Sequence, residues 1–184
     1  MTPGNEVSPQ EGGVQVGGEA IRAGGGVVCV NQPSPLRVSS CSPVFRDVTI
    51  RGNQAINGGG LAAVGYSETN PSFRNVSFVA NRADSLGGAA VITTRSAQVD
   101  TVTTAGIANP HFVRTTFQDN RSRAGAAVAL DVRKEGRANA QFVSTAFRDN
   151  RAGQRGGAVL LAGAANGQMT ADFTNALFYR NQAG

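Results

Sequence analysis

The sequence is poor in the residues that build metal and redox sites: among 184 residues it has no tryptophan, two cysteines and one histidine, His111. The cysteines form no C-x-x-C pair and have no histidine cluster beside them, so we expect no metal and no cofactor. No apolar run is long enough for a transmembrane helix. Met1–Gln10 lacks the basic and apolar parts of a signal peptide. The sequence therefore predicts either a cytosolic protein or part of an exported one without its export signal.

Lysine is also scarce, because the seventeen basic residues are sixteen arginines and Lys134. Against twelve acidic residues they give a net charge of +5, which permits contact with anionic partners. No dense basic run is present, so we expect a solvated positive face and no nucleic-acid partner. Cys29 and Cys41 fit one disulfide in an exported protein, and two unpaired thiols fit the same spacing.

Aromatic residues make up only 6% of the chain, yet all nine phenylalanines fall in one repeated pattern, F-x4-F-x2-N followed by a glycine pair and small or aliphatic residues. Five units begin at Phe45, Phe73, Phe112, Phe142 and Phe173. Five places later each unit has an apolar residue: Ile50, Phe78, Phe117, Phe147 and Phe178. Eight places later each has an asparagine: Asn53, Asn81, Asn120, Asn150 and Asn181. A period of this length is typical of solenoids.

The segments between units vary in length, and the longest contains an insertion at Arg95–Pro110 that we interpret as a protruding loop. Residues 19–30 resemble the second half of a unit and form a partial rung. Residues 1–18, rich in glycine, proline, glutamine and glutamate, predict a flexible or irregular N-terminal segment. We therefore predict one domain over 19–184, as a fragment of a longer protein.

Short apolar runs separated by glycine and asparagine favour strands over helices. The residues three and five places after the leading phenylalanine face the same side of one strand. The leading phenylalanine itself points inward from beyond a bend. The runs after the glycines form a second strand: Leu61–Val64, Ala89–Ile92, Ala127–Leu130 and Ala158–Leu161. We predict an all-β parallel β-helix of about five to six rungs with three short strands per rung.

This fold gives each repeated residue a structural role. We expect the asparagines to take left-handed geometry at a corner and to form a side-chain ladder, and the phenylalanines to stack in two further ladders. The glycines let the backbone turn tightly. The third unit has Gly125-Ala126 in place of the pair, one residue nearer its asparagine, so we expect a small kink without loss of the rung.

The F-x-x-N and G-G-A elements at Phe78–Asn81 with Gly87–Ala89, and at Phe147–Asn150 with Gly156–Val159, resemble the repeat of the polymorphic outer membrane proteins of chlamydiae. The resemblance covers roughly residues 19–184. It implies a right-handed β-helix that is the passenger of an autotransporter, displayed on the bacterial cell surface and used in adhesion. The implied partner is a surface protein or glycan of a host or neighbouring cell.

Two groups of residues are candidates for binding. Arg82, Arg121 and Arg151 each follow a ladder asparagine and form a row, extended by Gln54 and Gln182, that could meet an anionic glycan or phosphate. The alternative role of this row is solubility, with pairing to Asp119 and Asp149. The insertion and its exit supply the second group, which consists of Arg95 and Thr103 within the insertion and His111 directly after it.

Three functions remain open. The first is a non-catalytic surface module that binds through the loops after the second strand. The second is a fibre formed by head-to-tail stacking. The third is a polysaccharide lyase or glycosidase, for which Asp119 and Asp149, one rung apart, are the candidate carboxylates. Because the acids do not recur at that place in other units, we interpret them as turn residues and predict that the chain is not an enzyme.

Overall fold

The computed structural model describes residues 14–16, 19–21, 23–31, 39–99, 102–164 and 166–184. These residues form strands and turns throughout. Within these ranges no helix is long and apolar enough to span a membrane.

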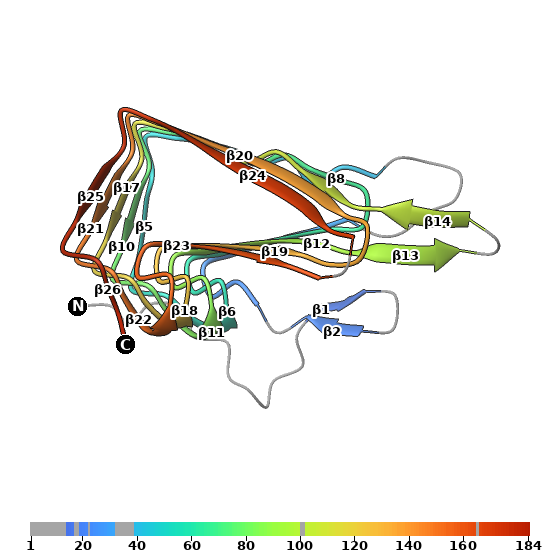
Figure 1. The fold of residues 1–184 in the computed structure, drawn as a ribbon, viewed down its shortest axis with the longest axis horizontal. Coiled ribbons are helices and arrows are strands. Elements are labelled where there is room, and N and C mark those ends of the chain that lie inside the picture. The colour runs from blue at the N-terminus through green and yellow to red at the C-terminus, as the bar shows by residue number, and fades with distance from the viewer. Residues whose placement is uncertain (1–13, 17–18, 22, 32–38, 100–101, 165) are drawn as a thin grey trace.

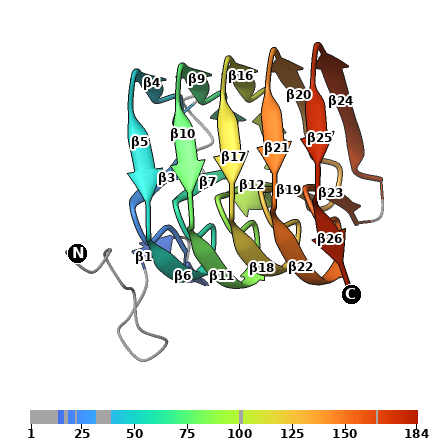
Figure 2. The ribbon, with the colours of Figure 1, turned by 90° about the vertical axis from the view of Figure 1, so that its left-hand side faces the viewer.

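Each full turn of the chain has four strands, as in β9 (Ser72–Arg74), β10 (Ser77–Val79), β11 (Arg82–Leu86) and β12 (Ala90–Thr94). Each strand pairs in parallel with its equivalents in the turns before and after. The predicted parallel β-solenoid is confirmed, with about five turns (Figures 1 and 2). In Figure 2 the front strands run downward while successive turns advance to the right, so the coil is right-handed.

The four sheets are named by their place in the unit. Sheet 1 carries the leading phenylalanines on β4 (Val44–Arg46), β9, β16 (His111–Val113), β20 (Arg137–Val143) and β24 (Gln168–Thr174), together with the short β8 (Glu68–Thr69) and β15 (Ile107–Ala108). Sheet 2 carries the second apolar residues on β5 (Thr49–Arg51), β10, β17 (Thr116–Gln118), β21 (Ala146–Arg148) and β25 (Leu177–Tyr179).

Sheets 3 and 4 follow the asparagine and the glycines. Sheet 3 contains β6 (Gln54–Asn57), β11, β18 (Arg121–Ala124), β22 (Arg151–Arg155) and β26 (Gln182–Ala183). Sheet 4 contains β3 (Val27–Val30), β7 (Leu61–Gly65), β12, β19 (Val128–Val132) and β23 (Val159–Gly163). Sheets 1 and 4 face each other, sheet 2 closes one end, and sheet 3 curls beneath sheet 4 (Figure 1).

The count of four strands per turn, where three were predicted, comes from two left-handed corners in every unit. Residues two and seven places after the leading phenylalanine have φ between 48° and 65°, and they are Asp47, Gly52, Asn75, Ala80, Arg114, Asp119, Ser144, Asp149, Asn175 and Arg180. The left-handed residue is therefore the one before the ladder asparagine, and the prediction that the asparagine itself takes this geometry was wrong.

The asparagine side chains nevertheless form the ladder that the repeat predicts. In each step the side-chain Nδ2 donates to the Oδ1 of the next asparagine, over 2.8–3.1 Å from Asn53 to Asn181. The backbone N–H of each asparagine donates to the same oxygen at 3.0–3.2 Å. Asn81, Asn120 and Asn150 are buried, so the ladder satisfies polar groups that water does not reach.

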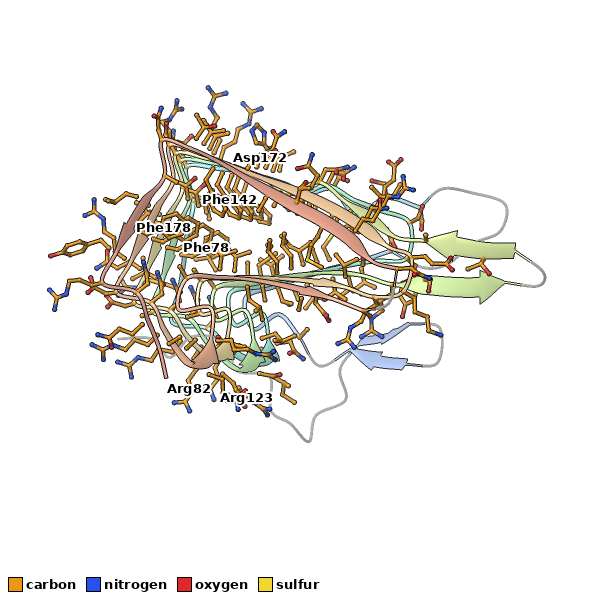
Figure 3. All side chains as sticks on the ribbon, viewed as in Figure 1. Phe78, Arg82, Arg123, Phe142, Asp172 and Phe178 are labelled. Carbon is orange, nitrogen blue, oxygen red and sulfur yellow. A yellow bond between two sulfur atoms is a disulfide. The ribbon has the colours of Figure 1, made fainter. Side chains whose placement is uncertain are left out.

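Two columns of stacked phenylalanines fill the space between sheets 1, 2 and 4 (Figure 3). Neighbouring rings within a column lie 4.6–5.2 Å apart and nearly parallel, and the two rings of one unit meet edge to face at 5.4–5.6 Å. The six inner rings are fully buried, whereas Phe173 and Phe178 in the last turn are 42% and 49% exposed. On that side the described strands of the last turn have no partner, and head-to-tail stacking stays a prediction.

The three inner strands of sheet 4, β7, β12 and β19, are buried on both faces. Their inward residues join the phenylalanine columns, and their outward residues form a second cluster that includes Ala62, Val91 and Ala129 and packs against Leu86 of sheet 3. A strand covered on both faces is read as a continuous apolar run, which explains why the runs after the glycines were recognisable in the sequence.

Each glycine pair makes the turn from sheet 3 into sheet 4. The first glycine has positive φ, as at Gly87, and a Cβ on Gly88 would lie 2.3 Å from the carbonyl oxygen of Ala126 in the next turn. In the shorter third unit, register shifts in the pairing of β18 with β11 and β22 absorb the missing residue. Strand β19 then pairs with β12 and β23 without a shift, so the prediction that the rung is kept is confirmed. A similar register shift occurs between β11 and β6, so it is not special to the third unit, and the predicted kink stays a prediction.

The N-terminal predictions need a partial correction. Within residues 1–18, Val14–Val16 forms strand β1, which pairs antiparallel with β2 (Glu19–Ile21), so this part is a hairpin. Residues 1–13 and 17–18 lie outside the described residues. In the predicted partial rung only the later part belongs to the solenoid, where β3 pairs in parallel with β7.

The insertion after β12 is a β-hairpin and not a loop. Strands β13 (Ser96–Val99) and β14 (Val102–Ala105) pair antiparallel and project away from the solenoid (Figure 1). The backbone N–H of Gly106 donates to the carbonyl of Arg95 at 3.0 Å, so the two ends of the insertion meet at its base. The chain then rejoins sheet 1 at β15.

Cys29 and Cys41 form a disulfide, which resolves the two alternatives left by their spacing. We expect the double variant Cys29→Ala/Cys41→Ala to lose about 3 kcal/mol of unfolding free energy, because the bridge closes a short loop in the unfolded chain. Urea denaturation with and without dithiothreitol measures the loss. The double variant is its own control, since reductant should not change its midpoint. An unmodified chain that is equally insensitive to reductant would contradict the prediction.

Candidate functional site

The arginine row predicted from the repeat lies on the outer face of sheet 3. The strand register places Arg82 opposite Arg121 and Arg121 opposite Arg151, with Gln54 and Gln182 continuing the row at its two ends. All three arginines are exposed. They reach one face because each directly follows a ladder asparagine, whose position the buried amides fix in every turn.

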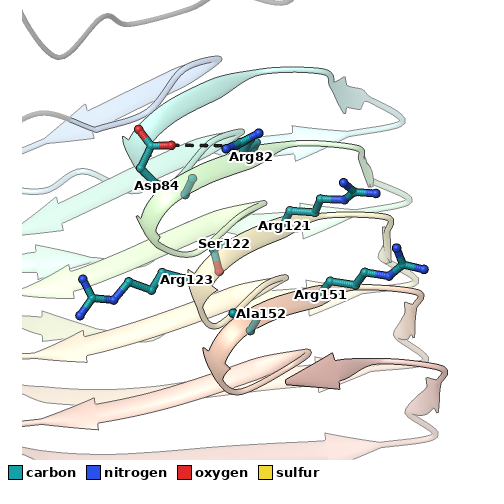
Figure 4. Close-up of a pocket in the computed structure, with 9 residues that line it drawn as sticks. Arg82, Asp84, Arg121, Ser122, Arg123, Arg151 and Ala152 are labelled. Atoms are coloured by element: carbon teal, nitrogen blue, oxygen red, sulfur yellow. Dashed lines mark ion pairs between the residues drawn. The ribbon is translucent and has the colours of Figure 1, made fainter. Parts of the chain in front are cut away.

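A shallow groove of about 430 Å³ runs beside this row. We call it the arginine groove, and its main lining residues are Arg82, Asp84, Arg121, Ser122, Arg123, Arg151 and Gly153. Figure 4 shows Arg121 and Arg151 extending side by side along one margin, whereas Arg123 extends in the opposite direction. Arg123 and Asp84 were not predicted as site residues, because neither position is basic or acidic throughout the repeat.

The charges of the arginine groove are only partly compensated. Arg82 approaches Asp84 at 4.0 Å, but within the described part of the chain neither Arg121 nor Arg151 forms an ion pair. Asp149, one of the acids suggested as their partner, pairs instead with Arg180 at 3.3 Å. The other, Asp119, accepts a hydrogen bond from Gln118 at 3.1 Å. The predicted pairing of the row with these two acids is therefore wrong.

The two candidate catalytic carboxylates occupy left-handed corners. Asp119 and Asp149 have φ of 55° and 54°, in keeping with their interpretation as turn residues. Their carboxylates contact the side chains of Gln118 and Arg180, on the convex edge between sheets 2 and 3. A glycosidase pair needs a substrate cleft between its carboxylates. Neither acid lines the groove beside the arginine row, and neither lines the two other hollows of about 270 and 470 Å³ in the described part of the chain.

Arg95 lies at the base of the hairpin, in a pocket of about 270 Å³ between sheet 4 and the edge of sheet 3. Apolar side chains such as Val64 and Val91 line one part of the pocket, and Asp131 and Arg133 line the other. Arg133 Nε donates to Asp131 Oδ2 at 2.8 Å. Burial lowers the pKa of the Arg95 guanidinium, Arg133 lowers it further, and Asp131 opposes both.

The sequence did not predict Asp131 and Arg133. They fall at the end of β19, where the connection to the next strand differs in length from turn to turn. Their positions therefore do not recur at a fixed place in the repeat. Nearby, burial raises the pKa of the Tyr66 hydroxyl. The pocket thus joins an apolar wall to a half-buried charged end.

The structure does not bring Thr103 and His111 into the pocket with Arg95. Thr103 is exposed on β14, the second strand of the hairpin. His111 lies half-buried on β16, where the register places Ser72 and Gln141 on either side of it. The three residues predicted from the insertion and its exit therefore belong to three separate places.

Over the ranges that the structure describes, no three histidine, cysteine, aspartate or glutamate residues are grouped to hold a metal ion. Comparisons with protein-family models, with curated protein sequences and with solved structures find no match for this chain.

Proposed function

We propose that this chain is a non-catalytic binding module displayed on a bacterial surface, and that the β13–β14 hairpin is its main recognition element. One observation carries the proposal: the hairpin stands out from an otherwise regular solenoid. Binding residues commonly lie on segments that a rigid scaffold positions. The repeat's resemblance to the polymorphic outer membrane proteins of chlamydiae supports the same assignment.

Two properties of the frame support this role. The ladders of asparagine and phenylalanine tie every turn to its neighbours, so the base of the hairpin is held in a fixed position. The Cys29–Cys41 disulfide favours an oxidising location, because disulfides persist outside the cytoplasm and are rare within it. The partner we propose is a protein or glycan on the surface of a host or neighbouring cell.

The pairing of the flanking strands leads us to expect that the hairpin can be removed without altering the solenoid. Thr94 before the hairpin pairs with Gly65 of the preceding turn, and Ile107 after it pairs with Glu68. In that preceding turn two residues, Tyr66 and Ser67, are enough to connect Gly65 to Glu68. Deleting residues 96–105 leaves Arg95-Gly106 as a connection of the same length. A matched control is available in the next turn, where deletion of Lys134 and Glu135 leaves Arg133-Gly136 between Val132 and Arg137.

We expect deletion of 96–105 to weaken binding of the fluorescently labelled chain to cultured mammalian and bacterial cells at least about tenfold, as expected when a binding hot spot is lost. The control deletion should leave binding within about twofold. Flow cytometry measures binding, and circular dichroism with a thermal melt checks that both variants keep the solenoid. Equal binding by the folded deletion variant and the unmodified chain would contradict the proposal.

A further inference from the structure

The positive charge of the chain is concentrated on sheet 3. Its strands β11, β18 and β22 contain five arginines and one aspartate: Arg82, Arg121, Arg123, Arg151, Arg155 and Asp84. Five positive and one negative charge give this sheet a net charge of +4, compared with +5 for the whole chain. Such a concentration on one face attracts a polyanion more strongly than the same charge spread over the surface would.

The stacking of these arginines works against the stability of the sheet. Like charges directly opposite each other on neighbouring strands repel, and the register puts Arg82, Arg121 and Arg151 in that relation. The structure nevertheless places Arg121 and Arg151 side by side (Figure 4). Glutamine occupies the same row at Gln54 and Gln182, so the fold itself does not need a cation there. An anionic ligand would relieve the repulsion.

We propose that the arginine groove binds an acidic polysaccharide, carboxylated or sulfated, lying along the solenoid axis. Neighbouring strands are about 4.8 Å apart, so the row offers a guanidinium at each step of that length. One sugar of an extended polysaccharide has a similar length. The planar guanidinium also matches the two oxygens of a carboxylate or sulfate group and binds them through parallel hydrogen bonds.

The lining of the arginine groove favours a polysaccharide over a single-stranded nucleic acid. Proteins that bind single strands usually stack the bases on aromatic side chains, and no aromatic residue lines this groove. Its floor includes Ser122, Ala152 and Gly153, and a Cβ on Gly153 would approach nothing closer than 4.0 Å. The small residues leave room for a sugar ring between Arg151 and Arg123.

The test compares two triple variants that lose the same charge. Arg82→Gln/Arg121→Gln/Arg151→Gln places in the row the residue that already occupies its two ends. The control Arg46→Gln/Arg74→Gln/Arg137→Gln removes three exposed arginines from sheet 1. Binding to heparin, polygalacturonate, a single-stranded oligonucleotide and neutral dextran is measured by isothermal titration calorimetry at two salt concentrations.

We expect the unmodified chain to bind both acidic polysaccharides and not dextran, with an affinity that falls as salt rises. The groove variant should bind at least about tenfold more weakly, and the control within about threefold, because the groove aligns three arginines on successive strands beside one hollow. In the control only Arg46 and Arg74 lie opposite each other, and Arg137 lies elsewhere on sheet 1. The affinity of the single variant Arg121→Gln should lie between those of the two triple variants. Thermal melts verify the fold of each variant.

Three results would overturn the proposal: no binding by the folded unmodified chain, equal losses in both triple variants, or tighter binding of an oligonucleotide than of heparin at matched charge. The inference does not rest on the hairpin. Deletion of 96–105 should leave polysaccharide binding unchanged, so failure of either proposal is distinguishable from failure of the other.

Discussion

Replacing Phe117 with alanine is expected to lower the free energy of unfolding by about 3–5 kcal/mol, one of the largest effects of any single change in this chain. The ring is fully buried and stacks between Phe78 at 5.0 Å and Phe147 at 5.1 Å. It also meets the edge of Phe112 at 5.5 Å. Alanine leaves a cavity that neither column can fill, because each ring is fixed by the turn above and below it.

The matched control is Phe178→Ala, which changes the same place of the repeat in the last turn. Phe178 is 49% exposed and stacks on one side only, against Phe147 at 4.7 Å, so we expect a loss of about 1–2 kcal/mol. Urea denaturation followed by circular dichroism measures both values. Hydrogen exchange should show the loss at Phe117 first in the amides of β16–β18, because each turn contacts only its neighbours. Equal losses in the two variants would contradict a core built from continuous stacks.

The repeat made most of the fold predictable from the sequence. Phe112, Phe117 and Asn120 recur in one phase, and each has a single role that its chemistry indicates: stacking for the rings and a hydrogen-bonded column for the amide. Consistency across five units outweighed the weak strand signal of any single unit. Parallel pairing and burial of the phenylalanines followed from that phase.

The corners were less predictable, because the left-handed residues share no residue type. Gly52 and Asn175 are usual at positive φ, but Ala80 and Arg180 hold the same geometry and carry no such signal. Ala80 adopts it because the strands on both sides are fixed by pairing with neighbouring turns. A single sequence read unit by unit therefore underestimates the number of strands.

The hairpin and the charged pocket were missed for a different reason. Ser96–Ala105 lies where the unit is longest, so the phase of the repeat gave no information about it, although its valines and threonines favour strands. Arg123 and Asp131 likewise occur at their places only once. The arginine row was predicted because it has a fixed phase, and Arg123 completes the groove only once the chain is folded.

Replacing Asn120 with leucine is expected to lower the free energy of unfolding by about 3–5 kcal/mol, because several buried polar groups lose their partners together. Asn120 Oδ1 accepts from the backbone N–H of Asn81 at 3.0 Å and from its Nδ2 at 3.1 Å. Asn120 Nδ2 donates to the carbonyl of Phe78 and to Asn150 Oδ1, both at 3.0 Å. Leucine fills the volume but satisfies none of these groups.

The variant Asn120→Asp separates the hydrogen bonds from the packing. Aspartate has the same shape and keeps the acceptor for Asn81, but it brings a carboxylate against the oxygens of Phe78 and Asn150 in a fully buried site. Burial and these oxygens favour the neutral acid, so the pKa of the new carboxyl should be higher in the folded than in the unfolded chain. A group with a raised folded pKa lowers stability as pH rises through that range, and the loss is smallest in acid.

We therefore expect Asn120→Asp to be destabilised at pH 7 and to recover part of the loss at acidic pH, where the protonated acid again donates a hydrogen bond. Asn120→Leu should show no such recovery relative to the unmodified chain. Urea denaturation of the three proteins over a pH series measures the differences. If only Asn120→Asp recovers stability in acid, the hydrogen bonds of the asparagine column stabilise the solenoid. If both variants respond to pH alike, the column stabilises the solenoid by packing alone.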